Sequence, residues 1–159
     1  SVVGETEPWP HKHARANSYL LSDKQFTGDI SVSLSARFRN QRFPNSRYLG
    51  CYLCYDPESG DGYWLSTGHA IGNYPSQAYI KEVHKQDWET KTRTTLEIVP
   101  GQWYQLVYRK AGDMLSLEVD GATIVTWQSD EFDRGHVQLR LHNTDVEIRD
   151  LRIEHASAE

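Results

Sequence analysis

Residues 135–142 read Gly-His-Val-Gln-Leu-Arg-Leu-His, and from His136 onward polar and apolar side chains alternate without a break. Successive side chains of an extended chain point to opposite faces, so Val137, Leu139 and Leu141 share one face. The polar residues His136, Gln138, Arg140 and His142 share the other face. We therefore predict a β-strand with one buried side, in a sheet that presents a polar, functional face to solvent.

The chain turns after this strand and returns. Residues 143–145, Asn-Thr-Asp, are types that favour turns, and the alternation resumes at Val146 on the even-numbered positions. At Leu151 and Ile153 the apolar positions are odd-numbered instead. One additional residue in the strand would restore the phase, so the pattern predicts a β-bulge near Asp150.

The same two-residue period recurs along the rest of the chain, most clearly over residues 30–38. Asp120-Gly121 is a dipeptide typical of a type I′ hairpin turn, in which both central residues have positive φ. Residues 94–99 are predicted to form a strand, and the charged segment 86–93, which carries Trp88, is predicted to be a loop. No segment shows the helical period.

Roughly ten short strands, with turns every eight to twelve residues, indicate an all-β domain. We predict a single domain over residues 1–159, folded as an antiparallel two-sheet β-sandwich or jelly roll. Residues 1–17 have no clear period and are expected to form an extended N-terminal arm, with a short edge strand at most.

The composition restricts the partners. Of the 159 residues, 38% are hydrophobic and 11% aromatic, and the formal net charge is −5. An acidic domain argues against nucleic acid and against a membrane surface as partners. The sequence also lacks an apolar run of the roughly 20 residues that a membrane span needs.

Cys51 and Cys54 are the only cysteines, at a C-x-x-C spacing within a predicted strand. In a strand their Cα atoms would lie about 10 Å apart with the side chains on opposite faces. A disulfide needs Cα atoms closer than about 7 Å, so we expect two buried free thiols.

Metal binding has only weak signals. The turn at residues 56–62 carries three acids, which could hold a structural Ca²⁺ with backbone carbonyls, although a plain turn fits the spacing better. His11-x-His13 is a second weak motif, and a solvated loop is the favoured interpretation. We expect no certain cofactor and leave the metal site unassigned.

Several segments occur in a familiar order: residues 19–30, the Gly101-Gln102-Trp103-Tyr104 step, the Asp120-Gly121 turn, and residues 135–153. From Tyr19 onward they resemble the concanavalin A-like (laminin-G-like) sandwich, and within it the 3-keto-disaccharide hydrolase domain family. The closing strands, residues 137–151, are the most specific part of the resemblance. It implies a β-sandwich that acts on or binds saccharides.

The departures from that family bear on function. The resemblance would place a Glu at Ser35 and another at Trp64, and a Gln where this chain has Arg140, whereas His142 matches. The two acidic side chains expected of a hydrolytic site are therefore absent at the matching positions. Glycoside hydrolysis usually needs two carboxylates about 5–10 Å apart.

The outward phases of the strands give one candidate ligand surface. Sugars stack their C–H faces on aromatic rings and hydrogen-bond to planar polar groups, and arginine binds carboxylate or sulfate in a bidentate manner. The candidate ligand-binding residues are Arg37, Arg39, Tyr52, Trp64, Gln138, Arg140 and His142. The alternative is that these are solvated sheet residues without a ligand.

We therefore predict a non-catalytic carbohydrate-binding module that recognises a polysaccharide. An acidic polysaccharide is the more specific form of this prediction. We expect it to be extracellular or periplasmic and part of a larger carbohydrate-active protein. Two alternatives stay open. One is a glycosidase- or lyase-type enzyme, in which His142 acts as general base with Glu82, His84 or Asp145 as partner. The other is a protein-interaction module that uses its loops.

Overall fold

The structure is a computed structural model and describes residues 3–7, 12–13, 18–38, 47–69, 77–142 and 145–158. Every regular element in these ranges is a β-strand. The strands are β1 (Val3–Glu7), β2 (Lys12–His13), β3 (Ser18–Leu21), β4 (Phe26–Phe38), β5 (Arg47–Tyr55), β6 (Gly62–His69), β7 (Gln77–His84), β8 (Asp87–Thr95), β9 (Trp103–Ala111), β10 (Met114–Val119), β11 (Ala122–Gln128), β12 (Arg134–His142) and β13 (Asp145–Ala158). The described ranges contain no helix that could span a membrane.

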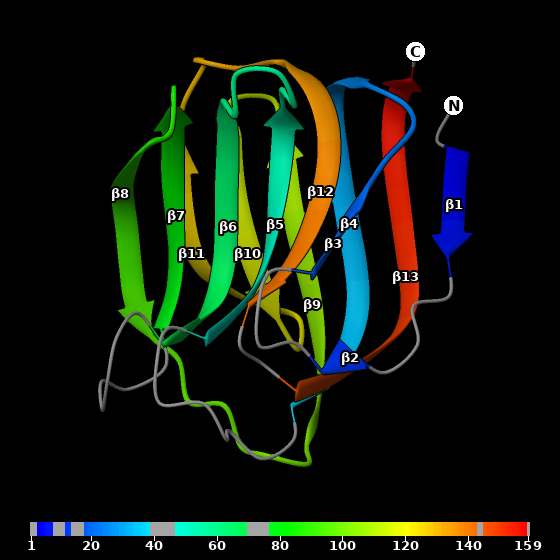
Figure 1. The fold of residues 1–159 in the computed structure, drawn as a ribbon, viewed down its shortest axis with the longest axis vertical. Helices are drawn as coiled ribbons and strands as arrows, with labels where there is room; N and C mark the ends of the chain where they lie inside the picture. Colours follow the sequence, from blue (N-terminus) through cyan, green and yellow to red (C-terminus); the bar gives the residue numbers. More distant parts are fainter. Residues whose placement is uncertain are drawn as a thin grey trace.

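The strands form two antiparallel layers (Figure 1). The front sheet has the order β3-β12-β5-β6-β7-β8, and the back sheet has the order β1-β13-β4-β9-β10-β11. The layers join where Arg134 and Gly135 of β12 pair with Thr27 and Phe26 of β4. The predicted fold class, an antiparallel two-sheet β-sandwich, is confirmed.

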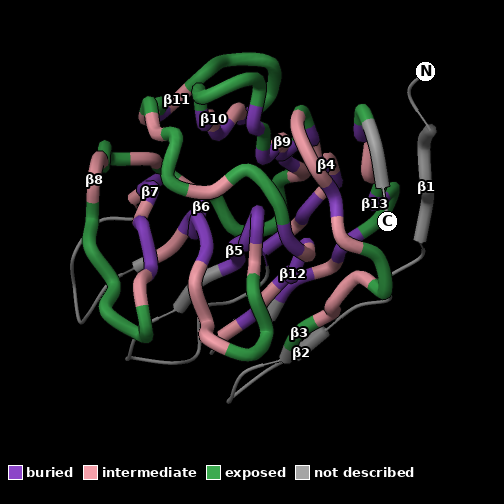
Figure 2. The backbone as a smooth tube through the Cα atoms, turned by 90° about the horizontal axis from the view of Figure 1, so that it is seen from above, coloured by how far each residue is buried: buried purple, intermediate pink, exposed green. Residues whose placement is uncertain are grey.

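The core lies between the two layers and follows the predicted alternation. Val32, Leu34 and Ala36 on β4 are fully buried, and so is Leu141 on β12. The neighbouring side chains of β4 in the opposite phase are only half-buried. Figure 2 shows buried segments along the strands of both layers, with exposed segments at the turns.

Two predicted irregularities are confirmed. The pairing of β13 with β4 shifts register between Arg149 and Arg152, and Asp150 has a φ of 57°, so the bulge lies where the phase slips. Asp120 and Gly121 have φ values of 51° and 83°, as a type I′ turn between β10 and β11 requires.

The prediction for the two cysteines was right in one respect and wrong in another. Both thiols are free and buried, but both belong to the same core cluster rather than to opposite faces. The reason is a second bulge: Cys54 has a φ of 54°, which turns its side chain back toward the core. Burial raises the pKa of the Cys54 thiol to about 11, and that of Cys51 well above its usual range.

Two other expectations were wrong. The segment with Trp88 belongs to strand β8, not to a loop, and residues 96–99 lie beyond the end of that strand. The arm does contain an edge strand, because β1 pairs with β13 from Val3 to Glu7. His11 and Arg39 lie outside the described residues.

Candidate functional site

The register of the front sheet aligns eleven residues in two cross-strand rows on its outer face, the face turned away from the core. The first row, from β3 to β8, is Tyr19, Arg140, Gly50, Ser66, Tyr79 and Arg93. The second, from β12 to β8, is Gln138, Tyr52, Trp64, Lys81 and Thr90. Directly opposed residues of antiparallel strands point to the same side of a sheet. These two rows therefore bring three cations and no carboxylate to one surface.

The guanidinium of Arg140 lies among three aromatic rings. Its Cζ atom is 5.2 Å from the ring centroid of Tyr52, 5.8 Å from that of Trp64 and 6.0 Å from that of Trp88. One terminal nitrogen, Nη2, donates a hydrogen bond to Gln138 Oε1 at 2.9 Å. The Nε atom is buried and makes no hydrogen bond to any of the described residues. The aromatic faces hold this cation in place, and its position is fixed before any ligand arrives.

The three rings also pack on one another. Ring centroids are 4.9 Å apart for Tyr52 and Trp64, 5.4 Å for Tyr52 and Trp88, and 5.7 Å for Trp64 and Trp88. The indole of Trp64 extends over Gly50, where a Cβ atom would overlap it. The cluster is therefore a compact platform spread over several strands of the front sheet.

The aromatic side chains on this face differ in how much of their surface is accessible to solvent. Tyr52 and Trp64 lie on the predicted outward face, but only 1% and 2% of their surface is accessible, so they are buried. Trp88 is 37% exposed and Tyr19, which pairs with Arg140, is 62% exposed. In this arrangement the ring faces open to a sugar belong to Trp88 and Tyr19, while Tyr52 and Trp64 support Arg140 and Trp88.

His142 lies two residues beyond Arg140 on β12 and is partly exposed. Burial and the positive charge of Arg140 lower the pKa of its imidazole, so the ring is neutral at pH 7. Burial also lowers the pKa of Lys81, whose Nζ lies 5.1 Å from the ring centroid of Tyr79. A neutral imidazole can accept a hydrogen bond from a hydroxyl through one nitrogen and donate one through the other.

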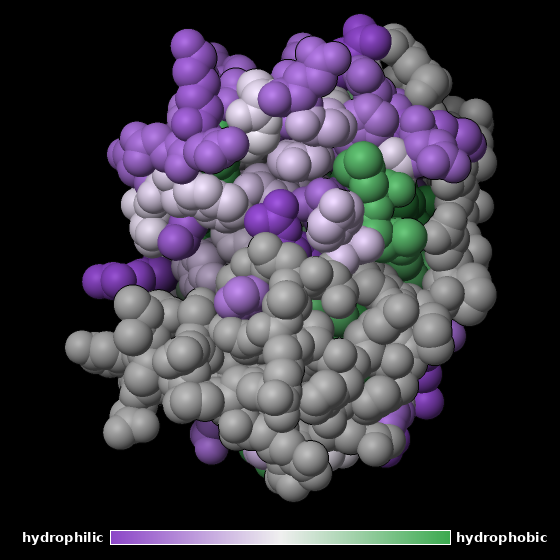
Figure 3. All heavy atoms as spheres, viewed as in Figure 1, coloured by the Kyte–Doolittle hydropathy of each residue, from purple (hydrophilic) through white to green (hydrophobic). Residues whose placement is uncertain are grey.

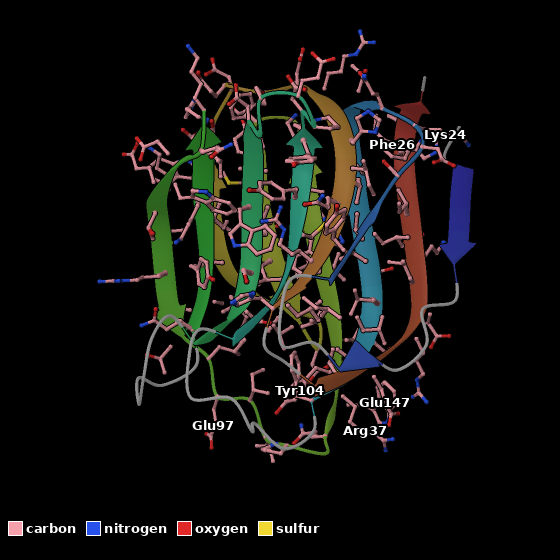
Figure 4. All side chains as sticks on the ribbon, viewed as in Figure 1. Lys24, Phe26, Arg37, Glu97, Tyr104 and Glu147 are labelled. Carbon is pink, nitrogen blue, oxygen red and sulfur yellow. The ribbon has the colours of Figure 1, made fainter. Side chains whose placement is uncertain are left out.

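The structure separates Arg37 from this surface. Arg37 lies on β4 in the back sheet, where its Nη2 forms a 2.6 Å ion pair with Glu147 and its Cζ lies 4.9 Å from the Trp103 centroid (Figure 4). The expectation that Arg37 and Arg140 share one surface was therefore wrong, because β4 and β12 belong to different layers for most of their length. Ligand binding by Arg37 on its own sheet stays a prediction.

The proposed partners of a catalytic His142 lie elsewhere or outside the described side chains. Glu82 lies on β7, three strand spacings or about 14 Å from β12. Its carboxylate faces the back sheet, where it accepts a 3.2 Å hydrogen bond from Trp127 Nε1. His84 lies 3.6 Å from that same carboxylate. The side chain of Asp145 is not among those described.

In the acidic turn at residues 56–62, two of the three carboxylates accept hydrogen bonds from backbone N–H groups. Asp56 Oδ1 accepts a hydrogen bond from the backbone N–H of Glu58, and Asp61 Oδ1 accepts one from that of Lys85. Hydrogen bonds from Glu58 and Ser59 lower the pKa of the Asp56 carboxyl. Within the described ranges no three His, Cys, Asp or Glu side chains are grouped as a metal site would need. A structural Ca²⁺ stays a prediction.

Sequence reasoning missed Trp88, Tyr19, Lys81 and Arg93. Tyr19 carried a weak signal, because it lies in a short hydrophobic segment, residues 19–21, that could form a strand. Trp88 carried none, since its contact with Tyr52 depends on how β8 is placed beside β7.

Comparisons with known proteins support the fold. No family model and no curated protein sequence matches the chain. Its fold is similar to that of the carbohydrate-binding module CBM66 from Bacillus subtilis, with a TM-score of 0.72, 11% identity and 94% of each chain covered. A protein with a galectin-like fold from Bacillus subtilis has a TM-score of 0.66 at 12% identity, over 99% of this chain and 89% of that one. Sheep galectin-11, in complex with glycerol, has a TM-score of 0.62 at 14% identity, over 84% of this chain and 96% of that one.

Identities this low show a shared fold and nothing more specific. The chain has a galectin-like jelly-roll sandwich, and this agrees with the broad concanavalin A-like resemblance. The narrower resemblance to 3-keto-disaccharide hydrolase domains has no support from a family model.

Proposed function

We propose that this protein is a non-catalytic carbohydrate-binding module that holds an acidic polysaccharide on the outer face of its front sheet. The observation that carries the proposal is the guanidinium of Arg140, which lies within about 6 Å of the rings of Tyr52, Trp64 and Trp88, beside two rows that contain no carboxylate.

The chemistry of the two rows suits a sugar acid. The charge of Arg140 is partly desolvated by its aromatic neighbours, which strengthens its attraction to a carboxylate or sulfate. The exposed rings of Trp88 and Tyr19 offer flat apolar surfaces for the C–H faces of pyranose rings. Lys81 and Arg93 extend the positive charge along the rows, although the chain as a whole carries a net charge of −5.

The structural neighbours favour the same class of partner. One is a carbohydrate-binding module and another is a galectin, and both share the sandwich over most of their length. A binding role is also favoured over cleavage, because the two rows lack the pair of carboxylates that most glycosidases use.

Affinity electrophoresis through gels that contain polygalacturonate or dextran tests the proposal. We expect polygalacturonate, but not dextran, to retard the wild-type protein. Arg140→Gln should weaken retention about tenfold, the effect of losing one charge-assisted contact, and Trp88→Ala should weaken it about tenfold through the loss of a stacking surface. Arg109→Gln is the matched control, because Arg109 is exposed on the back sheet, where it pairs with Glu118 at 3.1 Å.

Equal retention of wild type and Arg140→Gln would refute this placement of the site. A parallel gel with a chelator tests the predicted Ca²⁺, and an assay for new reducing ends or unsaturated products separates binding from turnover.

A module of this kind would act in an extracellular or periplasmic setting, attached to a larger carbohydrate-active protein. The genomic reading frame that encodes this chain tests that expectation, since a frame without any further domain would contradict it.

A further inference from the structure

An apolar cavity lies between the two sheets, on the inner side of the front sheet and therefore separate from the front-face rows. It is a cavity of about 100 Å³ beneath the segment that links β3 to β4. The lining side chains come from both layers: Leu20 and Leu21 of β3, Val137 and Leu139 of β12, Phe26 and Val32 of β4, and Leu151 and Ile153 of β13. An apolar patch is visible at this edge in Figure 3, beside β4 and β13.

The cavity exists because the chain crosses from one sheet to the other above it. β3 ends in the front sheet at Leu21 and β4 begins in the back sheet at Phe26, so the four residues 22–25 bridge the gap between the layers. This bridge forms the roof of the cavity, and Figure 4 places Lys24 and Phe26 at this end of the molecule.

The roof is held by hydrogen bonds to β12 and within the bridge. Ser22 N donates to Val137 O at 2.9 Å, and Ser22 Oγ accepts from Val137 N at 3.0 Å. Ser22 Oγ donates to Lys24 O at 2.7 Å, and Ser22 O lies 2.8 Å from His136 Nδ1. Gln25 accepts a hydrogen bond from Arg134 Nε at 2.9 Å. The roof is therefore fixed, and Ser22 has no hydrogen-bonding group left for an occupant.

We infer that this cavity binds the short alkyl end of a small amphiphilic molecule whose polar head stays at the mouth, beside Asp23 and Lys24. The eight lining side chains below the roof are hydrocarbon, so a buried polar group would lose its water without gaining a partner. Apolar cavities of about this size stay dry and bind small hydrocarbons or xenon. The inference is independent of the front-face site.

Methyl-resolved NMR of the whole chain tests this inference with two alcohols of equal length. We expect 1-butanol, and xenon under pressure, to shift the methyl signals of Leu20, Val137, Leu139 and Leu151. The control probe is 1,4-butanediol, which has a hydroxyl at both ends and should leave these signals unchanged. If xenon and butanol shift none of the four, or butanediol shifts them equally, the inference is wrong.

A pair of variants locates the site. Leu20→Trp should fill the cavity and weaken butanol binding by at least about tenfold. Leu96→Trp makes the same change at another partly buried leucine that packs on the core but does not line the cavity, and should leave binding unchanged. Binding retained in folded Leu20→Trp would overturn the assignment. Should Leu20→Trp fail to fold, Ile153→Ala decides: it enlarges the cavity and must extend binding to 1-hexanol.

Discussion

Gly50 leaves the space on the front face that the indole ring of Trp64 occupies. A Cβ atom at this position would overlap ring carbons of Trp64, which is itself 2% exposed and enclosed by its neighbours. Since Trp64 contributes one of the three rings around Arg140, the smallest residue of the row decides where the charge lies. The position requires glycine for space and not for an unusual backbone angle, since Gly50 has no positive φ.

We expect Gly50→Ala to lower the free energy of unfolding by about 1–3 kcal/mol, the usual cost of overpacking a close contact. The measurement is urea unfolding of the wild type, of each single variant and of the double variant with Trp64→Leu. Because the clash needs the indole, Gly50→Ala should cost clearly less in the Trp64→Leu background. Strictly additive effects would mean that the Trp64 ring does not depend on Gly50.

For single residues, the alternation in the sequence predicted correctly which face of the sheet a side chain occupies, but it did not predict how exposed that side chain is. Gln138 and Arg140 do share the outward face with Tyr52 and Trp64, as the two-residue period requires. The burial of the two rings was not predictable, because Trp88 from another strand packs on both of them. Local periodicity carries no information on which distant side chain covers a face.

Among the elements, β13 shows how a strand carries an irregularity that the sequence encodes. Its apolar side chains change phase between Ile148 and Leu151, and both are buried because the bulge at Asp150 absorbs the extra residue. Asp150 itself is exposed, with a φ of 57° that aspartate tolerates better than a β-branched residue does.

We therefore expect Asp150→Val to destabilise the protein by about 1–3 kcal/mol, the cost of holding a β-branched residue in the left-handed region. Asp150→Gly should be neutral or slightly stabilising, since glycine adopts this conformation without steric cost. Thermal unfolding of both variants provides the comparison. Because the Asp150 side chain is exposed, lost packing cannot account for a difference, and equal stabilities would contradict a strained bulge.

The element that the sequence did not reveal is β8. Its nine residues carry Asp87, Glu89, Lys91 and Arg93, a density of charge that is typical of loops. β8 is the edge strand of the front sheet and most of its side chains are exposed, so it has few positions that must be apolar. Edge strands often carry charges that prevent pairing with another molecule. Composition alone does not separate such a strand from a loop.

For the molecule as a whole, Glu82 ties the two sheets together on the side opposite the apolar cavity. Its carboxylate accepts a hydrogen bond from Trp127 Nε1 on β11 of the back sheet, and Lys91 Nζ on β8 lies 3.8 Å away. Burial by itself raises the pKa of Glu82, but hydrogen bonds from Ser129 and Trp127 and the charge of Lys91 outweigh it and leave the pKa lowered. The ionised form is therefore favoured by folding.

A carboxyl whose pKa is lower in the folded than in the unfolded state stabilises the fold above its unfolded pKa, near 4.3, and loses that contribution as the pH falls through the folded value. We expect Glu82→Gln to cost about 1–3 kcal/mol at pH 7 and to flatten the decline in stability between about pH 5 and pH 3. Trp127→Phe should flatten the same decline in part, because it removes one donor to the carboxylate.

Glu97→Gln, at an exposed position beyond β8, is the matched control and should leave the curve of stability against pH unchanged. Urea unfolding at a series of pH values provides the test. If Glu82→Gln followed the wild-type curve in parallel, the ionised carboxylate would not be what links the sheets at this edge.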